Sequence, residues 1–213
     1  HGLEIGERSD SFLTSSFSGG EIDPGQFSIS CWLSLSPGAA VKYIYREATG
    51  TNIANDALNA QYSGRVLYID GSNILRFNIN YVDGSSAYRT DQYFVDLDNV
   101  SQWPGLTNTE FHVVATHSGS VNSTSAGALY INGSRIINLT TSAGGGSSNL
   151  QNSPRQVIIN NGRAGTSETL RGTSGRSYLD ELVILNTTAS QDAVTALYNC
   201  GTKVTLGSIS TIP

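Results

Sequence analysis

Charged side chains are scarce in this chain, at 14% of its 213 residues, against about 25% in a typical globular domain. Lysine is almost missing, with two residues beside ten arginines, and the formal net charge is −5. Phosphate binding requires clustered lysine and arginine side chains, so we do not expect nucleic acid as a partner. No apolar run approaches the ~20 residues of a membrane-spanning helix, so we do not expect membrane insertion.

Methionine is absent, and the chain begins at His1. We therefore expect a processed product or an excised piece of a longer protein, in which a missing targeting segment says nothing about the compartment. The two cysteines, Cys31 and Cys200, cannot form a four-ligand structural zinc site. Cys31 shares one strand face with Phe27 and Leu33, so we expect a buried free thiol. A disulfide between Cys31 and Cys200, stabilising by ~3–4 kcal/mol, is the alternative.

Short segments with alternating side chains fill most of the chain and are separated by turn residues, which is typical of β-strands. The predicted strands are 2–5, 11–17, 27–35, 41–46, 65–70, 74–81, 88–96, 111–117, 128–132, 135–139, 155–160, 178–185 and 202–209. Pairs that tolerate positive φ mark the turns, and Asn132-Gly133 and Asp83-Gly84 are the strongest hairpin signals. Asp70-Gly71 and Asn161-Gly162 are predicted turns of the same kind.

No long helical pattern precedes residue 188, which excludes alternating βαβ units. A short helical piece is predicted at 53–60, and the Gly- and Ser-rich segment 140–153 is predicted to be a flexible loop. We therefore predict one all-β domain over residues 1–213. Its architecture would be a β-sandwich of two antiparallel sheets packed face to face, with jelly-roll connections and one short C-terminal helix.

The segment 177–199 predicts a strand that leads directly into this helix. Leu182 and Ile184 point one way and Val183 and Leu185 the other, so both faces of the strand should be covered. Either Thr188 or Ser190 can cap the helix, and the spacing from Thr188 to Gln191 is that of a capping box. Apolar side chains then recur at helical spacing at Ala193, Val194, Leu197 and Tyr198.

Three segments together resemble one known family. They are 27–35 (FSISCWLSL), the pair 111–119 and 127–137 (FHVVATHSG and GALYINGSRII), and the strand–helix ending with Leu179, Asp180, Glu181, Leu182, Ile184, Leu185, Asn186, Leu197, Tyr198 and Asn199. In this order they resemble the concanavalin A-like lectin/glucanase superfamily, in particular its laminin-G-like branch. Phe111 stands where the family usually has Trp, and Asn132 where it often has Asp. The resemblance covers roughly residues 3–200 and implies a concanavalin A-like fold more than a function.

Enzymatic activity is not expected. Glycosidases on this fold place acidic residues at E-x-D-x-x-E so that two carboxylates can flank a glycosidic bond, and no such triplet occurs. Asp180 and Glu181 form the nearest acidic pair, but neighbouring residues of a strand point to opposite faces. No G-x-S-x-G nucleophile motif is present either.

Calcium is a candidate cofactor because many members of the resembled family hold Ca²⁺ with loop carboxylates, amides and carbonyls. Asp70, Asp83 and Asp91 are candidate ligands, but Asp96 and Asp98 form the best pair, since both carboxylates can fall on one side. Solvated turn acids are the alternative interpretation of this pair.

Glycan binding is suggested by a concentration of tyrosine and arginine between residues 43 and 103, because aromatic rings stack on sugars and polar groups hydrogen-bond to hydroxyls. Tyr43 and Tyr45 are predicted to share one strand face. Ordinary sandwich residues are the alternative. The predicted ligand-binding residues are Tyr43, Tyr45, Arg46, Tyr62, Arg65, Tyr81, Tyr88, Arg89 and Trp103.

These observations favour a non-catalytic, lectin-like recognition domain that binds a glycan or a surface protein, located extracellularly or on a virion surface. The alternative is a viral or phage structural or decoration protein that uses the same sandwich for protein–protein assembly, as a homo-oligomer or within a virion. The Ser-, Gly- and Asn-rich composition, the scarcity of lysine and the lack of a sharp site favour this alternative.

Overall fold

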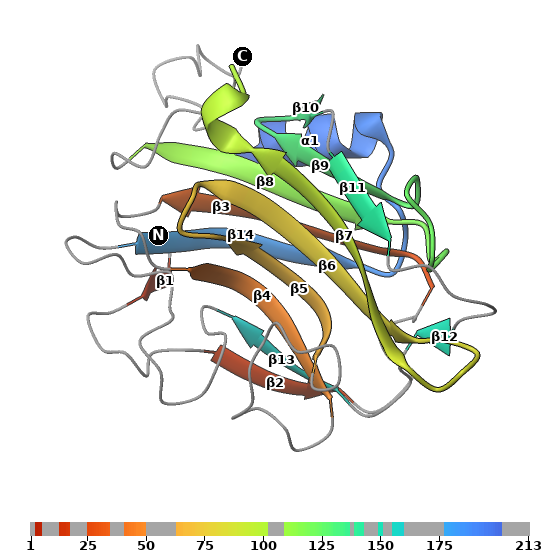
Figure 1. The fold of residues 1–213 in the computed structure, drawn as a ribbon. Coiled ribbons are helices and arrows are strands. Elements are labelled where there is room, and N and C mark those ends of the chain that lie inside the picture. Colours follow the sequence, from red (N-terminus) through yellow and green to blue (C-terminus); the bar gives the residue numbers. More distant parts are fainter. Residues whose placement is uncertain are drawn as a thin grey trace, which may run out of the picture.

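Two antiparallel sheets lie one in front of the other in Figure 1. The computed structural model describes residues 3–5, 13–17, 25–34, 41–49, 63–101, 109–136, 139–142, 149–150, 155–159 and 177–201, and the side chains of 25–34, 41–47, 64–101, 109–136 and 179–200. We call the sheet nearer the viewer in Figure 1 the front sheet and the other the back sheet. The predicted all-β sandwich with a short C-terminal helix is confirmed.

The back sheet contains the predicted C-terminal strand between two partners. Its order is β1 (Leu3–Ile5), β14 (Ser177–Leu185), β3 (Phe27–Ser34), β8 (Glu110–His117), β9 (Gly127–Ile131) and β10 (Ser134–Ile136). Leu182 and Ile184 of β14 pack against the core, and Leu185 packs against a smaller apolar cluster on the other face. The prediction that this strand is covered on both faces is confirmed.

The front sheet has the order β11 (Leu139–Ser142), β7 (Tyr88–Asp96), β6 (Ile74–Val82), β5 (Ser63–Ile69), β4 (Lys42–Thr49), β13 (Arg155–Ile159) and β2 (Leu13–Phe17). Strand β12 (Asn149–Leu150) pairs with the end of β6, and a 3₁₀ helix, η1 (Leu97–Asn99), follows β7. The chain crosses repeatedly between the sheets, for example from β3 to β4 and from β7 to β8.

The core lies between the sheets, where inward-facing side chains alternate with outward-facing ones along each strand. The rings of Phe27 on β3 and Phe77 on β6 stack with their centroids 6.5 Å apart, which joins the two layers. Cys31 is fully buried in the same core, and both Cys31 and Cys200 are free. The prediction of a buried free thiol is confirmed, and the alternative disulfide is wrong.

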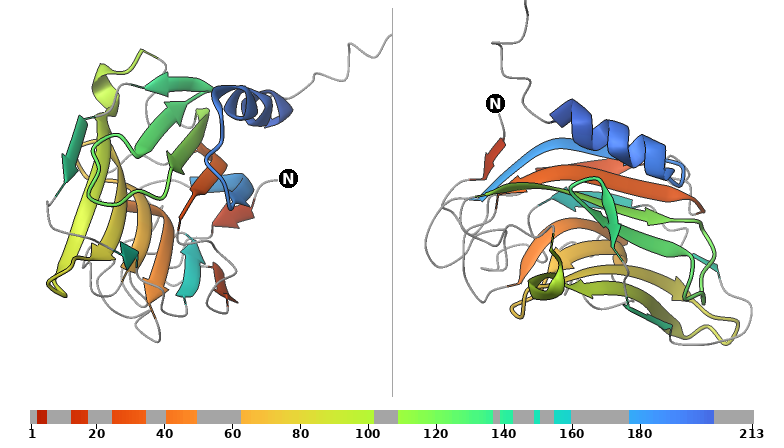
Figure 2. Two further views of the ribbon diagram at one scale, coloured as in Figure 1. Left: turned by 90° about the vertical axis from the view of Figure 1, so that its right-hand side faces the viewer. Right: turned by 90° about the horizontal axis from the view of Figure 1, so that it is seen from above.

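Helix α1 (Gln191–Gly201) lies against the outer face of the back sheet, as Figure 2 shows from the side. Val194 packs there against Val114 and Tyr130. Ser190 caps the helix, because its Oγ accepts a hydrogen bond of 3.2 Å from the Ala193 N–H. The capping box through Thr188 is wrong, since the Thr188 hydroxyl instead donates to the His117 carbonyl at 3.0 Å. Within the described residues, no helix is both long and apolar enough to cross a membrane.

Turn chemistry follows the sequence at both main hairpins. Asn132 and Gly133 have φ of 50° and 77° between β9 and β10, and Asp83-Gly84 begins the turn between β6 and β7. The loop predicted at 140–153 is wrong in two places, because β11 and β12 are strands that pair with β7 and β6. This pairing uses backbone groups, so these strands need no apolar side-chain pattern in the sequence. The helix predicted at 53–60, the turn at Asn161-Gly162 and the strand at 202–209 lie outside the described residues.

Candidate functional site

The outer face of the front sheet carries a row of polar side chains. Phe77 and Ile79 of β6 point into the core, so their neighbours Asn78 and Asn80 point outward. Strand pairing places Gln92 of β7 opposite Asn78 and places Thr90 and Tyr88 farther along the same outer face. We call Asn78, Asn80, Tyr88, Thr90 and Gln92 the polar strip.

Hydrogen bonds connect the polar strip across the two strands. The Gln92 Nε2 donates to the Asn78 Oδ1 at 2.8 Å, and the Thr90 hydroxyl donates to the Asn80 Oδ1 at 2.6 Å. At one end, the Arg76 guanidinium donates to the Gln92 Oε1 at 2.6 Å and to the Asp70 carboxylate at 2.7 Å. These hydrogen bonds orient the side chains of Asn78, Asn80, Thr90 and Gln92.

Asn80 has an unused hydrogen-bond donor. Its side chain is fully buried, and its Nδ2 has no partner among the residues that the structure describes. Leaving a buried amide donor unsatisfied costs about 1–3 kcal/mol, so such a group in a native protein requires an explanation. A ligand oxygen that accepts from this nitrogen would provide one, provided that the groups covering the nitrogen move aside, since it has no exposed surface.

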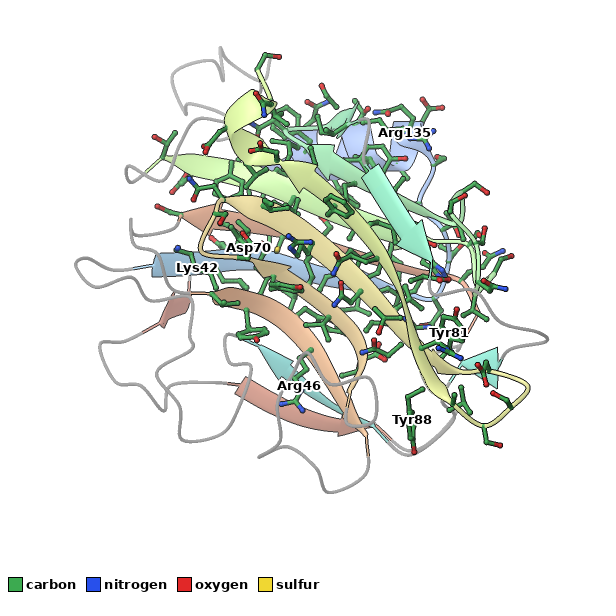
Figure 3. The ribbon with its side chains drawn as sticks, in the orientation of Figure 1. Lys42, Arg46, Asp70, Tyr81, Tyr88 and Arg135 are labelled. Carbon is green, nitrogen blue, oxygen red and sulfur yellow. The ribbon has the colours of Figure 1, made fainter. Side chains whose placement is uncertain are left out.

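Tyr88 places an exposed aromatic ring beside Asn80. The side chain is 48% exposed and lies opposite Val82, near the free end of the β6–β7 ribbon (Figure 3). Because Asn80 pairs with Thr90, two residues from Tyr88, the two side chains are diagonal neighbours, which lie roughly 7–8 Å apart in a sheet. A ring and a donor at this spacing can contact one sugar together once the donor is uncovered.

The predicted ligand-binding residues divide between the two faces of the front sheet. Tyr88 and the buried Arg46 (Figure 3) and Tyr43 lie on its outer side. The prediction that Tyr43 and Tyr45 share one face is wrong, because a register shift between them turns Tyr45 into the core.

The interior holds three more of the predicted residues. Tyr45, Arg65 and Tyr81 have no exposed surface and point to the core side, so a ligand on the outer face cannot touch them. Arg89 donates to the Asp83 carboxylate at 2.7 Å within the β6–β7 turn. Tyr62 and Trp103 lie outside the described residues. A binding role for each predicted residue stays a prediction.

The candidate calcium pair is engaged in local turn structure. Asp96 caps η1, accepting from the Asp98 N–H at 3.1 Å and from the Asn99 Nδ2 at 2.7 Å. Asp98 accepts from the Asn73 Nδ2 at 3.3 and 3.4 Å. The part of the chain that the structure describes contains no group of three His, Cys, Asp or Glu residues that could hold a metal ion. Calcium binding by Asp96 and Asp98 stays a prediction.

The amides of the polar strip were not among the predicted site residues. A signal for them exists in the sequence, since polar residues occupy alternate positions 76, 78 and 80 of one strand and 90 and 92 of the next. This alternation assigns the residues to one face, but it does not show which of them keeps an unused donor.

No protein-family model and no curated protein matches this sequence. Among solved structures, the chain is similar to the receptor-binding domain of a botulinum neurotoxin C/D mosaic serotype, with a TM-score of 0.59 and 16% identity over 91% of this chain and 41% of that one. It is also similar to the botulinum neurotoxin serotype D ligand-binding domain in complex with N-acetylneuraminic acid. The TM-score is 0.58 and the identity 15%, over 90% of this chain and 40% of that one. The botulinum neurotoxin type G receptor-binding domain is similar with a TM-score of 0.53 and 14% sequence identity, over 92% of this chain and 41% of that one.

The chain spans about two fifths of the length of these structures. At such low identity, the similarity concerns the fold: the chain has the β-sandwich architecture found in the receptor-binding domains of these toxins.

Proposed function

We propose that this protein is a non-catalytic, carbohydrate-binding recognition domain that acts outside the cell or on a particle surface, and that its sugar site is the polar strip on the front sheet. The observation that carries the proposal is the unused, fully buried Nδ2 of Asn80 next to the exposed ring of Tyr88. Fixed polar groups beside an aromatic ring are the usual means of orienting a sugar.

The chemistry of the strip suits an uncharged sugar. Asn80 supplies a donor and Tyr88 supplies a ring, while Thr90 and Gln92 are neutral. Arg76, the cation at the end of the strip, lies 2.7 Å from the Asp70 carboxylate, and this partner reduces its attraction for an acidic sugar. We therefore expect neutral glycans to bind more tightly than sialylated ones. The similarity to the toxin domains supports a recognition role only through the shared architecture.

A glycan array tests the proposal with the wild-type protein and two variants of one residue. Tyr88→Ala removes the ring and is expected to weaken binding by roughly tenfold. Tyr88→Phe keeps the ring and is expected to keep most of the affinity. Absence of binding to every glycan class contradicts the proposal, and stable self-association in the same sample would then favour the structural or decoration alternative.

A further inference from the structure

Three aromatic rings meet on the outer face of the back sheet, on the opposite side of the sandwich from the polar strip. Trp32 of β3 lies opposite His112 of β8, with ring centroids 5.3 Å apart. Tyr198 of α1 stacks on Trp32 at 5.5 Å and lies 5.8 Å from His112. We call Trp32, His112 and Tyr198 the aromatic cluster.

Two nitrogen atoms of the aromatic cluster have unused hydrogen-bonding capacity. The Trp32 Nε1 and the His112 Nδ1 are shielded from solvent and have no partner within the described residues. His112 is 1% exposed, and its other nitrogen, Nε2, lies 2.8 Å from the Ser30 hydroxyl. A histidine pairs one nitrogen with an orienting group and leaves the other to act, which is the arrangement seen here.

A strained bulge places a carboxylate beside the cluster. Asp180 of β14 is paired with Trp32, and the register of β14 shifts immediately after it. The next residue, Glu181, has a φ of 49°, which costs a residue other than glycine about 1–3 kcal/mol. The Glu181 N–H donates to the Asp180 Oδ1 at 2.8 Å, which fixes the carboxylate next to the partly exposed indole.

We propose that the aromatic cluster and Asp180 form a second binding site, one that takes a hydroxyl-bearing, uncharged ligand such as a sugar ring, with the Tyr198 side chain as its movable cover. A hydroxyl group accepts from the Trp32 N–H and donates to the Asp180 carboxylate. A second hydroxyl of the same ligand satisfies the His112 Nδ1, since it accepts from a protonated Nδ1 and donates to an unprotonated one. An anion is disfavoured by the adjacent carboxylates of Asp180 and Glu181.

The position of Tyr198 explains how a ligand reaches the shielded nitrogens. Tyr198 lies in the last turn of α1 (Gln191–Gly201), and helix ends fray more readily than helix centres. Its side chain is partly exposed, and its ring covers Trp32 and His112 through ring contacts. The apolar contacts of Val194 and Ala189 keep the start of the helix on the sheet when the end moves.

Tryptophan fluorescence tests this site directly, because Trp32 reports on its own ring contacts. The chain has two tryptophans, so a Trp103→Phe background leaves Trp32 as the single reporter. This protein is titrated with glucose, galactose, mannose and N-acetylglucosamine. We expect a saturable change in Trp32 emission, weakened roughly tenfold or more by Asp180→Asn, which removes a charge-assisted hydrogen bond.

Two controls separate the second site from the polar strip and from misfolding. Tyr88→Ala is expected to leave the Trp32 response unchanged, since it alters the opposite face, and the second site stands even if the front sheet binds no sugar. His112→Phe is expected to abolish the response, and circular dichroism checks that each variant is folded. Three results overturn the proposal: no saturable change with any of these sugars, a change that persists in Asp180→Asn, or a change that Tyr88→Ala removes.

Discussion

Glu47 of β4 and Arg65 of β5 form an ion pair of 2.9 Å on the core side of the front sheet, and both side chains are fully buried. The Tyr45 hydroxyl donates to the same carboxylate oxygen at 2.8 Å. The Arg65 guanidinium also lies 4.4 Å from the centroid of the Phe27 ring on the opposite sheet. The charges of this pair are thus compensated by each other, by a hydroxyl and by an aromatic face, so the pair links β4, β5 and β3.

Removing one member of this pair is expected to destabilise the fold strongly. Glu47→Gln leaves the Arg65 charge buried beside a neutral partner, and a broken buried pair costs about 3–5 kcal/mol. The free energy of unfolding, measured by urea denaturation, checks the value. Arg76→Gln is the control, because the partly exposed Arg76–Asp70 pair contributes only about 0–1 kcal/mol. Equal losses in the two variants would contradict the assignment of Glu47 and Arg65 to the interior.

Stability is expected to fall as the pH drops from 6.5 toward 4. Burial lowers the pKa of His112 and of His117 to about 4, and for His117 the nearby Arg65 adds to the effect. Unfolded histidine has a pKa near 6.5, so the unfolded chain binds more protons than the folded one in this window. Each histidine then lowers the free energy of unfolding by about 1.4 kcal/mol for every unit by which the pH falls within this window.

The pH dependence of urea unfolding measures this slope. His112→Gln is the matched variant, because its amide can still hydrogen-bond to Ser30 but does not titrate in this range. We expect the variant to lose about half of the slope. A free energy of unfolding that does not change between pH 7 and 4.5, or that rises as the pH falls, would show that the two histidines are not buried in their neutral form.

The two thiols are expected to differ sharply in reactivity. Burial raises the pKa of the Cys31 thiol to about 12, whereas Cys200 is exposed on α1. Because the thiolate is the reactive form, Ellman's reagent should modify Cys200 in the folded protein and Cys31 only after denaturation. Cys200→Ser should therefore abolish the rapid reaction. Rapid modification that persists in this variant would place Cys31 at the surface.

Gly127 occupies a position where no larger residue fits. A Cβ built there would lie 2.5 Å from the Tyr93 ring, which is itself fixed by a 2.6 Å hydrogen bond to the Ser123 carbonyl. Gly127→Ala is therefore expected to destabilise the protein by about 1–3 kcal/mol in thermal or urea unfolding. Gly84→Ala, in an exposed turn, serves as the control and should stay within about 0.5 kcal/mol of the wild type. Equal stability of the two variants would contradict the packing of β9 on β7.

The sandwich could be predicted from the sequence because alternation of side chains and turn pairs are local signals. Asn132-Gly133 and the strand 178–185 are where such signals are strongest, and both predictions are confirmed. Strand β11 could not be predicted, because Thr140 to Ser142 pair through backbone groups at a sheet edge and show no apolar pattern.

The site was harder to predict because the face of a residue depends on register and not on spacing alone. The bulge in β4 separates Tyr43 from Tyr45, and no residue type in the sequence marks it. Arg65 and Glu47 occupy inward positions that normally hold apolar residues, and they do so as a buried ion pair. The lack of a partner for the Asn80 Nδ2 and the His112 Nδ1 depends on which neighbours are present in space, and alternation does not specify them.

The central claim, sugar binding on the polar strip, is tested most directly by the side-chain amide of Asn80. In a ¹⁵N-edited NMR spectrum, the Asn80 Nδ2 signals can be assigned with an Asn80→Asp variant and followed during titration with the neutral glycan that binds best on the array. We predict that these signals and the backbone signal of Tyr88 shift together and saturate. A glycan that binds while both sets of signals stay unchanged would contradict the account.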